Sequence, residues 1–371
     1  MALETKHNIL WVQLLRAMAA ESVVIFHTKV ILARPDYGSV TTISGLGSTG
    51  WLGVNLFFVI SGFIMMHAHS RDFGMRGRVP HYAWRRFTRV YPLYWILLTA
   101  FISAAALGLG RADFKWEAIH LASAYSLLSL TDMPAMPLKV AWTLLFEVKF
   151  YIVFAALLFS RRIGWTIIGV WGAAILLRNM FTPLPDWGYL APDWGMLSIW
   201  NINFLLGMGS WWLLRRLDDR HALPVFVAGL LMLAVTLQFV DPDMNITVLR
   251  PPVMIALGVC FALVIAGGAL CERRFRWRPP AFALMLGDAS YSIYLVHSAA
   301  ISLLAGLHHK FLLGTAPAEV VVAATFLLAS GAGIACHFLL EKPLLNMIRK
   351  VGAQRAVRRA PPAVPGVGHA S

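Results

Sequence analysis

The stretch LWVQLLRAMAAESVVIFHTKVIL, residues 10–32, sets the interpretation of the whole chain. It is mostly apolar and has the length that a helix needs to cross about 30 Å of hydrocarbon. It nevertheless contains Arg16, Glu21 and His27, which are costly in a bilayer unless they are paired or functional. Because Arg16 interrupts it and no convincing A-x-A cleavage pattern follows, we interpret it as a retained first helix rather than a secretory signal.

The composition extends this interpretation to the rest of the chain. Of the 371 residues, 58% are hydrophobic and 13% are charged, whereas about a quarter of the residues of a soluble domain are charged. The apolar residues fall in blocks of membrane-spanning length, so we predict an all-α polytopic membrane protein of about ten transmembrane helices. The predicted spans are Leu10–Leu32, Gly50–His69, Val90–Leu109, Ala141–Ser160, Ile163–Met180, Met196–Leu214, Leu223–Val240, Pro252–Leu270, Leu284–Gly306 and Ala318–Leu340.

The charges of the intervening loops predict the orientation. Arginines are concentrated in every second loop, as the positive-inside rule requires of cytoplasmic loops, whereas the other loops carry Asp132, Asp186 and Asp241. This alternation fits ten spans with both termini in the cytoplasm. The apolar segment Trp116–Leu130 is shorter, and counting it as a span would invert every later loop. We therefore predict that it is a re-entrant or interfacial segment.

The same loops explain the formal net charge of +14, because arginines between apolar blocks face anionic lipid. The lipid bilayer, and not nucleic acid, is thus the expected partner. The three cysteines lie far apart and indicate neither a disulfide framework nor a metal site. We expect residues 1–346 to form one membrane domain and residues 347–371, rich in Pro, Ala, Gly and Arg, to form a disordered basic cytoplasmic tail.

The polar residues within the spans can be placed by depth. Arg16 and His27 are eleven residues apart, so they share one helix face about 16 Å apart along its axis. On the same reckoning His27, Asn55 and Glu147 come to a similar level in the outer half of the membrane. Their agreement in depth predicts a polar chamber that opens toward the outside, although each residue alone could simply pair within the helix packing.

Other polar residues leave two interpretations open. Arg85, Arg86 and Arg89 in HYAWRRFTRVYPLYW fit an anion-binding site, but they also fit the ordinary anchoring of a cytoplasmic helix end. Glu21 shares a face with neither Arg16 nor His27, so structural pairing and function remain equal alternatives for it. Further polar candidates near the middle of the spans are Ser61, Tyr294 and His297.

Six motifs in a fixed order resemble those of the acyltransferase-3 family of membrane acyltransferases, and the likeness is greatest to its exopolysaccharide O-acetyltransferase branch. They are LLRAMAAESVVIFH, GWLGVNLFFVISGFIM, WRRFTRVYPLYW, AWTLLFEVKFY, LGDASYSIYLVH and EKPLL, and the resemblance covers about residues 8–346. The resemblance implies a ten-helix core that moves an acyl group, usually acetyl, from cytoplasmic acyl-CoA to a hydroxyl of a glycan. It implies that His27 is the catalytic base, that the segment around Arg86 serves the donor and that Glu147 is functional.

The chain departs from the family pattern at two positions. Asn55 stands where the family often has Asp, which removes a carboxylate, and Glu21 stands where an apolar residue is usual. No SGNH-type esterase domain follows the membrane domain, so we expect the chemistry to be completed in the membrane.

These residues suggest a mechanism. His27 is the expected general base, because imidazole titrates near neutral pH, and Glu147 is expected to orient it. We expect Arg16, Arg85, Arg86 and Arg89 to bind the phosphates of acetyl-CoA, which is a donor substrate and not a tightly bound cofactor. Asn55, Ser61, Tyr294 and His297 are candidates for contacts with the substrates.

A different class of function stays open, because proton-coupled transporters of glycans or acyl compounds also carry ionisable residues in mid-membrane. Neither the inverted repeats nor the broken helices typical of such transporters are visible in the sequence. The expected location is the bacterial inner membrane, with a polysaccharide or lipid-linked glycan as acceptor. The acyl group, the acceptor hydroxyl and the oligomeric state, a homodimer included, are not fixed by the sequence.

Overall fold

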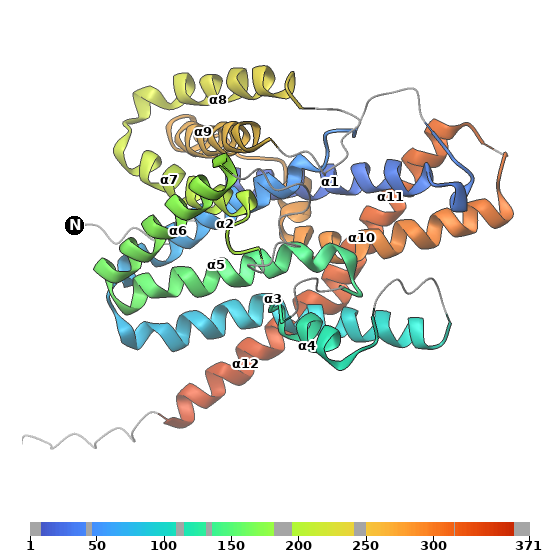
Figure 1. The fold of residues 1–371 in the computed structure, drawn as a ribbon, viewed down its shortest axis with the longest axis horizontal. Helices are drawn as coiled ribbons and strands as arrows, with labels where there is room; N and C mark the ends of the chain where they lie inside the picture. Colours follow the sequence, from blue (N-terminus) through green and yellow to red (C-terminus); the bar gives the residue numbers. More distant parts are fainter. Residues whose placement is uncertain are drawn as a thin grey trace, which may run out of the picture.

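The computed structural model describes residues 9–41, 47–108, 115–130, 136–181, 195–240, 250–314 and 316–359. This part of the chain consists of helices and connecting turns and contains no strand, which confirms the predicted all-α class (Figure 1). Its α-helices are α1 (Leu10–Leu32), α2 (Leu52–His69), α3 (Val79–Ala106), α4 (Ala118–Ser126), α5 (Trp142–Phe159), α6 (Arg161–Phe181), α7 (Ile202–Arg216), α8 (Ala222–Leu237), α9 (Pro251–Phe275), α10 (Ala281–Phe311), α11 (Ala318–Cys336) and α12 (Lys342–Arg359).

Each predicted span corresponds to one long helix, and eight segments of the described chain are long and apolar enough to cross a membrane. They are Leu52–Asp72, Arg76–Ala106, Lys139–Phe159, Arg161–Phe181, Asp219–Leu237, Pro251–Phe275, Ala281–Phe311 and Ala318–Val351. Helix α1, which carries Arg16, Glu21 and Lys29, and the 15-residue α7 are not among them. The protein is thus a multi-pass membrane protein, and the number of ten spans stays a prediction. The segment expected to be re-entrant or interfacial contains α4, whose nine residues are too few to cross hydrocarbon.

Helix α1 packs against α2, α9, α10 and α11. A Cβ atom at Gly53 of α2 or at Gly287 of α10 would lie 2.3 or 2.2 Å from a backbone carbonyl oxygen of α1. Glycine at these positions therefore allows both helices to approach α1 closely. The backbone N–H groups of Leu10 and Trp11 donate to the carboxylate of Glu272 at 3.0 and 2.6 Å, so a residue of α9 caps the start of α1.

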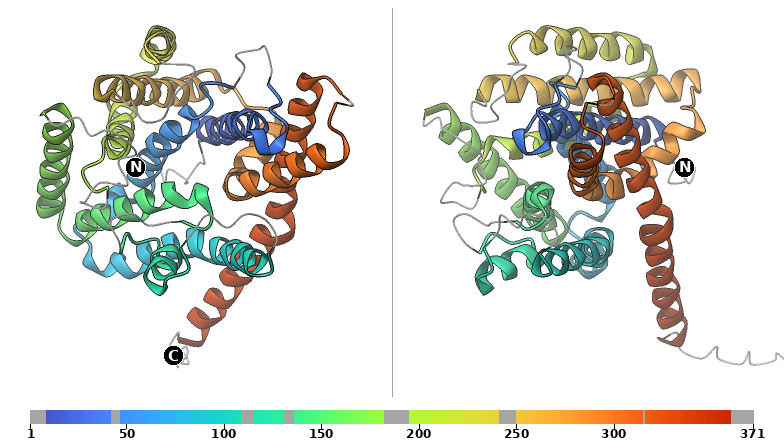
Figure 2. Two further views of the ribbon diagram at one scale, coloured as in Figure 1. Left: turned by 45° about the vertical axis from the view of Figure 1, so that its right-hand side comes forward. Right: turned by 90° about the vertical axis from the view of Figure 1, so that its right-hand side faces the viewer.

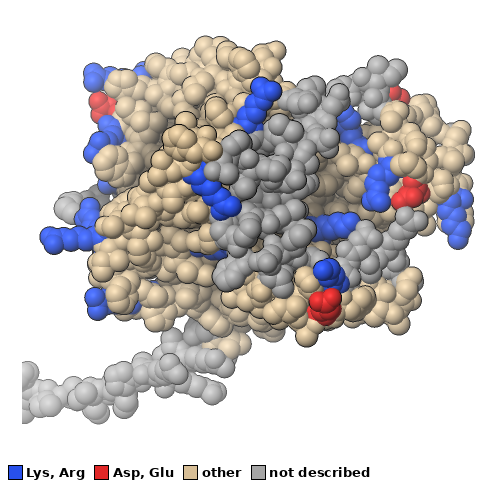
Figure 3. Space-filling model, in the orientation of Figure 1, with Lys and Arg blue, Asp and Glu red and all other residues tan. Residues whose placement is uncertain are grey.

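Two contacts join turns that carry arginines to neighbouring turns. Arg76 Nε donates to the Phe159 carbonyl oxygen at 3.3 Å, and Arg273 forms an ion pair with Asp219. Each contact joins two loops that the positive-inside rule assigns to the same side, as the predicted topology requires. On the face shown in Figure 3, uncharged residues make up most of the described surface, and Lys and Arg are far more numerous on it than Asp and Glu. Which side is cytoplasmic stays a prediction.

The C-terminal segment differs from its expected disorder. After α11 the chain forms a π-helical turn at His337–Glu341 and continues as α12, which runs to Arg359. Residues 347–359 are therefore helical, and the boundary expected at residue 346 falls inside α12. The far part of α12 projects away from the other helices, as Figure 2 shows. The remainder of the expected tail, residues 360–371, lies outside the described residues.

Candidate active site

A cavity of about 790 Å³ lies among α1, α2, α3, α5, α10 and α12. Its lining residues on α2 recur mostly at intervals of three or four and so mark one face of that helix. They are Val54, Phe57, Phe58, Ile60, Ser61, Ile64 and Met65. Because Val54 and Met65 are eleven residues apart, the cavity follows α2 for about 16 Å.

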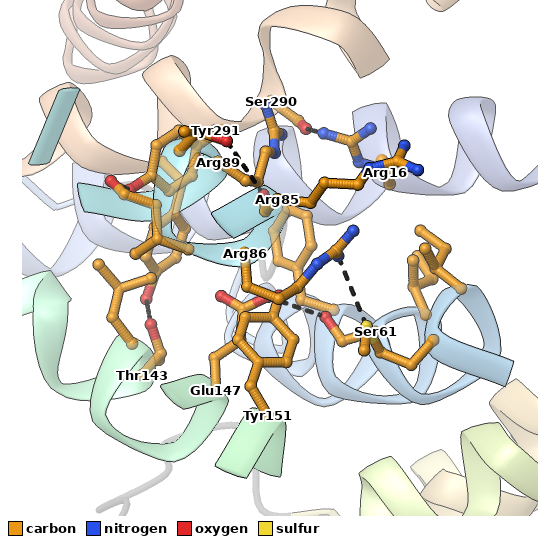
Figure 4. A pocket seen from close by; sticks show the side chains of 18 of the residues that line it. Arg16, Ser61, Arg85, Arg86, Arg89, Thr143, Glu147, Tyr151, Ser290 and Tyr291 are labelled. Atoms are coloured by element: carbon orange, nitrogen blue, oxygen red, sulfur yellow. Dashed lines mark hydrogen bonds between the residues drawn. The ribbon is translucent and has the colours of Figure 1, made fainter. Parts of the chain in front are cut away.

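Arginine dominates the charged lining of this cavity. Five arginines contribute, and they are Arg16, Arg85, Arg86, Arg89 and Arg349. In Figure 4 the side chains of Arg85, Arg86 and Arg89 reach the cavity from α3, whereas Glu147 and Tyr151 approach from α5 below. Glu147 is the one carboxylate among the lining residues. Within the described residues the cavity is therefore strongly cationic.

These arginines are held in different ways. Arg89 forms an ion pair of 2.7 Å with Glu341. Arg16 donates to Ser290 Oγ at 2.9 Å, and Arg86 donates to Met65 Sδ at 3.5 Å. Only the first of these three contacts neutralises a charge, so the others leave cationic groups for an anionic ligand.

Glu147 lies in the cavity wall but does not reach His27. Its carboxylate accepts hydrogen bonds from Ser61 Oγ, at 3.3 Å, and from the Tyr151 hydroxyl. No hydrogen bond joins Glu147 to His27 in the described part of the chain. The expected orienting contact is therefore not formed, because the partners of Glu147 come from α2 and from its own helix.

The partner of His27 is another histidine. His27 Nδ1 lies 3.3 Å from His297 Nε2 and 3.0 Å from the Val23 carbonyl oxygen. His297 is fully buried, and its Nδ1 lies 2.6 Å from the Tyr294 carbonyl oxygen. Since both carbonyls require an N–H, we assign the proton of each neutral ring to Nδ1. His27 Nδ1–H is then shared between the Val23 carbonyl and His297 Nε2, and His27 Nε2 has no hydrogen-bond partner among the described residues.

Tyr294 connects this histidine pair with the cavity. Its side chain lines the cavity, and its hydroxyl lies 2.9 Å from Thr143 Oγ1 and 3.0 Å from the Val140 carbonyl oxygen. Its own carbonyl accepts from His297. Neither His27 nor His297 is among the residues that line the cavity. Two polar regions thus adjoin at Tyr294.

Comparison with known proteins assigns a family to this arrangement. A model described as an acyltransferase domain, acyltransferase-3, matches residues 9–340. The chain belongs to the acyltransferase-3 family. It is therefore a membrane acyltransferase, and the resemblance inferred from its motifs is confirmed.

Two relatives support this family assignment. The chain is 32% identical over 328 residues to the exopolysaccharide production protein ExoZ of Rhizobium meliloti (strain 1021), across 84% of this chain and 95% of ExoZ. It is 26% identical over 382 residues to the acyltransferase MdmB of Streptomyces mycarofaciens, across 94% of this chain and 93% of MdmB. No solved structure matches the chain.

In this acyltransferase, the predicted site residue Asn55 lies in neither the cavity wall nor the histidine pair. Asn55 is fully buried, and its Nδ2 donates to Met254 Sδ of α9 at 3.6 Å. It lies off the α2 face that lines the cavity, so the expected chamber of His27, Asn55 and Glu147 is not formed. The depth estimate gave each residue its level but could not give the direction in which it faces.

Among the arginines and carboxylates of the cavity region, Glu341 and Arg349 were not predicted. Glu341, in the π-helical turn, binds Arg89 and accepts from Ser292 Oγ at 2.7 Å and His337 Nδ1 at 2.8 Å. Arg349 was assigned to a disordered tail but lines the cavity. The EKPLL motif was the available signal for Glu341, whereas Arg349 stands in a basic segment with no distinguishing pattern.

Glu21 receives a structural partner. Its Oε2 accepts a hydrogen bond of 2.6 Å from Ser330 Oγ of α11, while its Oε1 is buried without a partner in the described residues. The contact joins α1 to α11. It supports the structural alternative for Glu21.

Proposed function

We propose that this acyltransferase moves an acetyl group from acetyl-CoA to a hydroxyl of a polysaccharide or lipid-linked glycan at the bacterial inner membrane. One observation carries the proposal: Tyr294 in the wall of an arginine-lined cavity contacts a pair of histidines, and one ring nitrogen of that pair has no partner among the described residues. The cavity suits a long anionic donor, and the pair suits proton transfer.

The donor would occupy the cavity along its length. Acetyl-CoA carries phosphates at one end and a thioester at the other, joined by an uncharged pantetheine arm. Guanidinium groups bind phosphate through charge-assisted hydrogen bonds, so Arg16, Arg85, Arg86 and Arg89 would hold the anionic end. The thioester would then reach the region of Tyr294 and, beyond it, His27.

His27 would act as the general base. Its Nε2 would take the proton of the acceptor hydroxyl while the oxygen attacks the thioester carbonyl carbon. This attack would form the new C–O bond and a tetrahedral intermediate. Collapse of the intermediate would re-form the carbonyl and break the C–S bond, and the coenzyme A thiolate would take the proton from His27. His297 would take the place expected for Glu147, because it accepts from His27 Nδ1 and keeps Nε2 unprotonated.

The first experiment tests the reaction itself. Membranes of a deletion strain that expresses the wild-type chain are supplied with acetyl-CoA labelled in the acetyl group, and label is measured in the isolated polysaccharide together with free coenzyme A. We expect label and free coenzyme A to appear together. Glycan movement across the membrane without thioester cleavage would overturn the proposal and favour a transporter.

A further inference from the structure

The mouth of the cavity is formed by two facing helices. On α3 the lining residues His81, Trp84 and Arg85 share a face, since they are three and four positions apart. On α12 the lining residues Leu345, Ile348 and Arg349 share a face for the same reason. Helix α12 packs against α3, so the two faces enclose one opening.

This opening lies at the end of the cavity that is remote from the histidine pair. Toward the histidine pair, the ring of Tyr294 packs against Phe57 of α2 at a centroid distance of 5.8 Å. Toward the other end, Arg86 of α3 contacts Met65, which is eleven residues from Val54 along α2. A ligand with its reactive group at Tyr294 would therefore place its opposite end between α3 and α12.

The mouth combines free charge with an accessible aromatic ring. Trp84 is 53% exposed although it lines the cavity, and its ring packs beside Phe87 at a centroid distance of 5.8 Å. Arg85 and Arg349 are exposed and form no ion pair with the described residues. By contrast Arg89, deeper in the cavity, is neutralised by Glu341.

The position of α12 is fixed by the same carboxylate. Glu341 is 2% exposed and binds Arg89 of α3, Ser292 of α10 and His337 of its own turn. It lies eight residues before Arg349, or about 12 Å along the helix. Glu341 therefore anchors the base of α12 where Arg349 can face the mouth.

We infer that the mouth between α3 and α12 binds the adenosine 3′-phosphate end of coenzyme A, with Trp84 stacking on adenine and with Arg85 and Arg349 binding the 3′-phosphate. This subsite rests on the proposed function. Stacking on an aromatic side chain and contact with guanidinium groups are the interactions by which adenine and phosphate are bound. Helix α12 is then part of the donor site and discriminates coenzyme A from donors without a 3′-phosphate.

The test compares acetyl-CoA with acetyl-3′-dephospho-CoA as donors. For the wild type we expect kcat/KM to be about tenfold higher with acetyl-CoA, the effect of one charge-assisted contact. Arg349→Ala should reduce this ratio toward one, Arg349→Lys should retain part of it, and Lys350→Ala, next in sequence but absent from the lining, should keep it. An unchanged ratio in Arg349→Ala would overturn the inference.

A binding measurement separates this inference from the proposed function. Titration of coenzyme A and 3′-dephospho-CoA into the protein in zwitterionic nanodiscs requires no reaction, and we expect the same dependence on Arg349. If neither donor is used but this preference persists, the subsite stands and the proposed function fails. If the substitution changes only binding to anionic lipid, Arg349 binds headgroups and the inference is wrong.

Discussion

The cavity and the histidine pair adjoin at Tyr294, but their polar groups are held by opposite means. Several arginines of the cavity form no ion pair with a carboxylate of the described residues, so a bound anion would complement their charge. His27 and His297 form a neutral pair whose ring protons are directed by backbone carbonyls. The arrangement of the cavity favours binding of an anion, whereas the arrangement of the histidine pair fixes which ring nitrogen carries the proton.

This difference separates the expected effects of substitutions. Changes in the histidine pair should lower kcat and leave the Michaelis constant for acetyl-CoA near its wild-type value. Changes among the cavity arginines should raise that constant. Substitutions that fail to divide in this way would show that the two regions act as one site.

The largest effect is expected for His27→Ala. Loss of a general base typically lowers the rate by about 10²- to 10⁴-fold, so kcat for labelled acetyl transfer should fall into that range. His309→Ala is the matched control, because His309 is an exposed histidine on α10, the helix that carries His297. Acetyl transfer that survives in His27→Ala would remove His27 from the mechanism.

Glu341→Ala tests how the cavity arginines are held, and its effect is measured as a change in the free energy of unfolding. This substitution removes the carboxylate that pairs with Arg89. Removing one partner of a fully buried ion pair destabilises a protein by about 3–5 kcal/mol. The Arg89 side chain is 33% exposed, so we expect the lower end, about 3 kcal/mol, in denaturant unfolding of the purified protein.

The exposed Glu319, in the first turn of α11, provides the control for this experiment, and Glu319→Ala should cost less than about 1 kcal/mol. Replacing both partners, in Arg89→Leu with Glu341→Leu, should recover most of the stability because no charge is left unpaired. A double variant as unstable as Glu341→Ala would contradict the ion-pair explanation.

A smaller effect is expected for His297→Phe, which removes one of the two acceptors for His27 Nδ1–H, leaves the Val23 carbonyl and keeps an aromatic ring. We expect kcat to fall about 10- to 100-fold, less than for loss of the base itself, with little change in the Michaelis constant. His297→Gln should restore part of the rate, since its amide oxygen can accept from His27. If Gln and Phe give equal rates, His297 acts through packing alone.

Most of the helices could be predicted from the sequence because its apolar residues are grouped in long blocks. Leu10–Leu32 was predicted with the bounds that α1 has, and the short Trp116–Leu130 segment contains only the nine-residue α4. The C-terminal end was not predictable in the same way. Residues 347–359 are polar, and α12 begins from a turn whose position depends on the distant contact of Glu341 with Arg89.

The site was predictable by level but not by direction. Arg16, Arg86 and Glu147 line the cavity as expected, whereas Asn55 turns to α9 from a helix whose other face is the cavity wall. Depth follows from counting residues, but direction requires knowledge of which helices are neighbours. Because the neighbours of α1 were not known from the sequence, the contact of His27 with His297, rather than with Glu147, was not predicted.

The smallest effects are expected outside both regions, at the contact between Glu21 and Ser330. Ser330→Ala leaves the Glu21 carboxyl without this hydrogen bond and should destabilise the protein by about 1 kcal/mol, measured by denaturant unfolding, with acetyl transfer unchanged. Glu21→Gln keeps an oxygen that accepts from Ser330 and should be nearly neutral in both assays. A fall in kcat with Glu21→Gln at unchanged stability would instead require an ionised carboxylate there and would make α1 carry a third functional group beside Arg16 and His27.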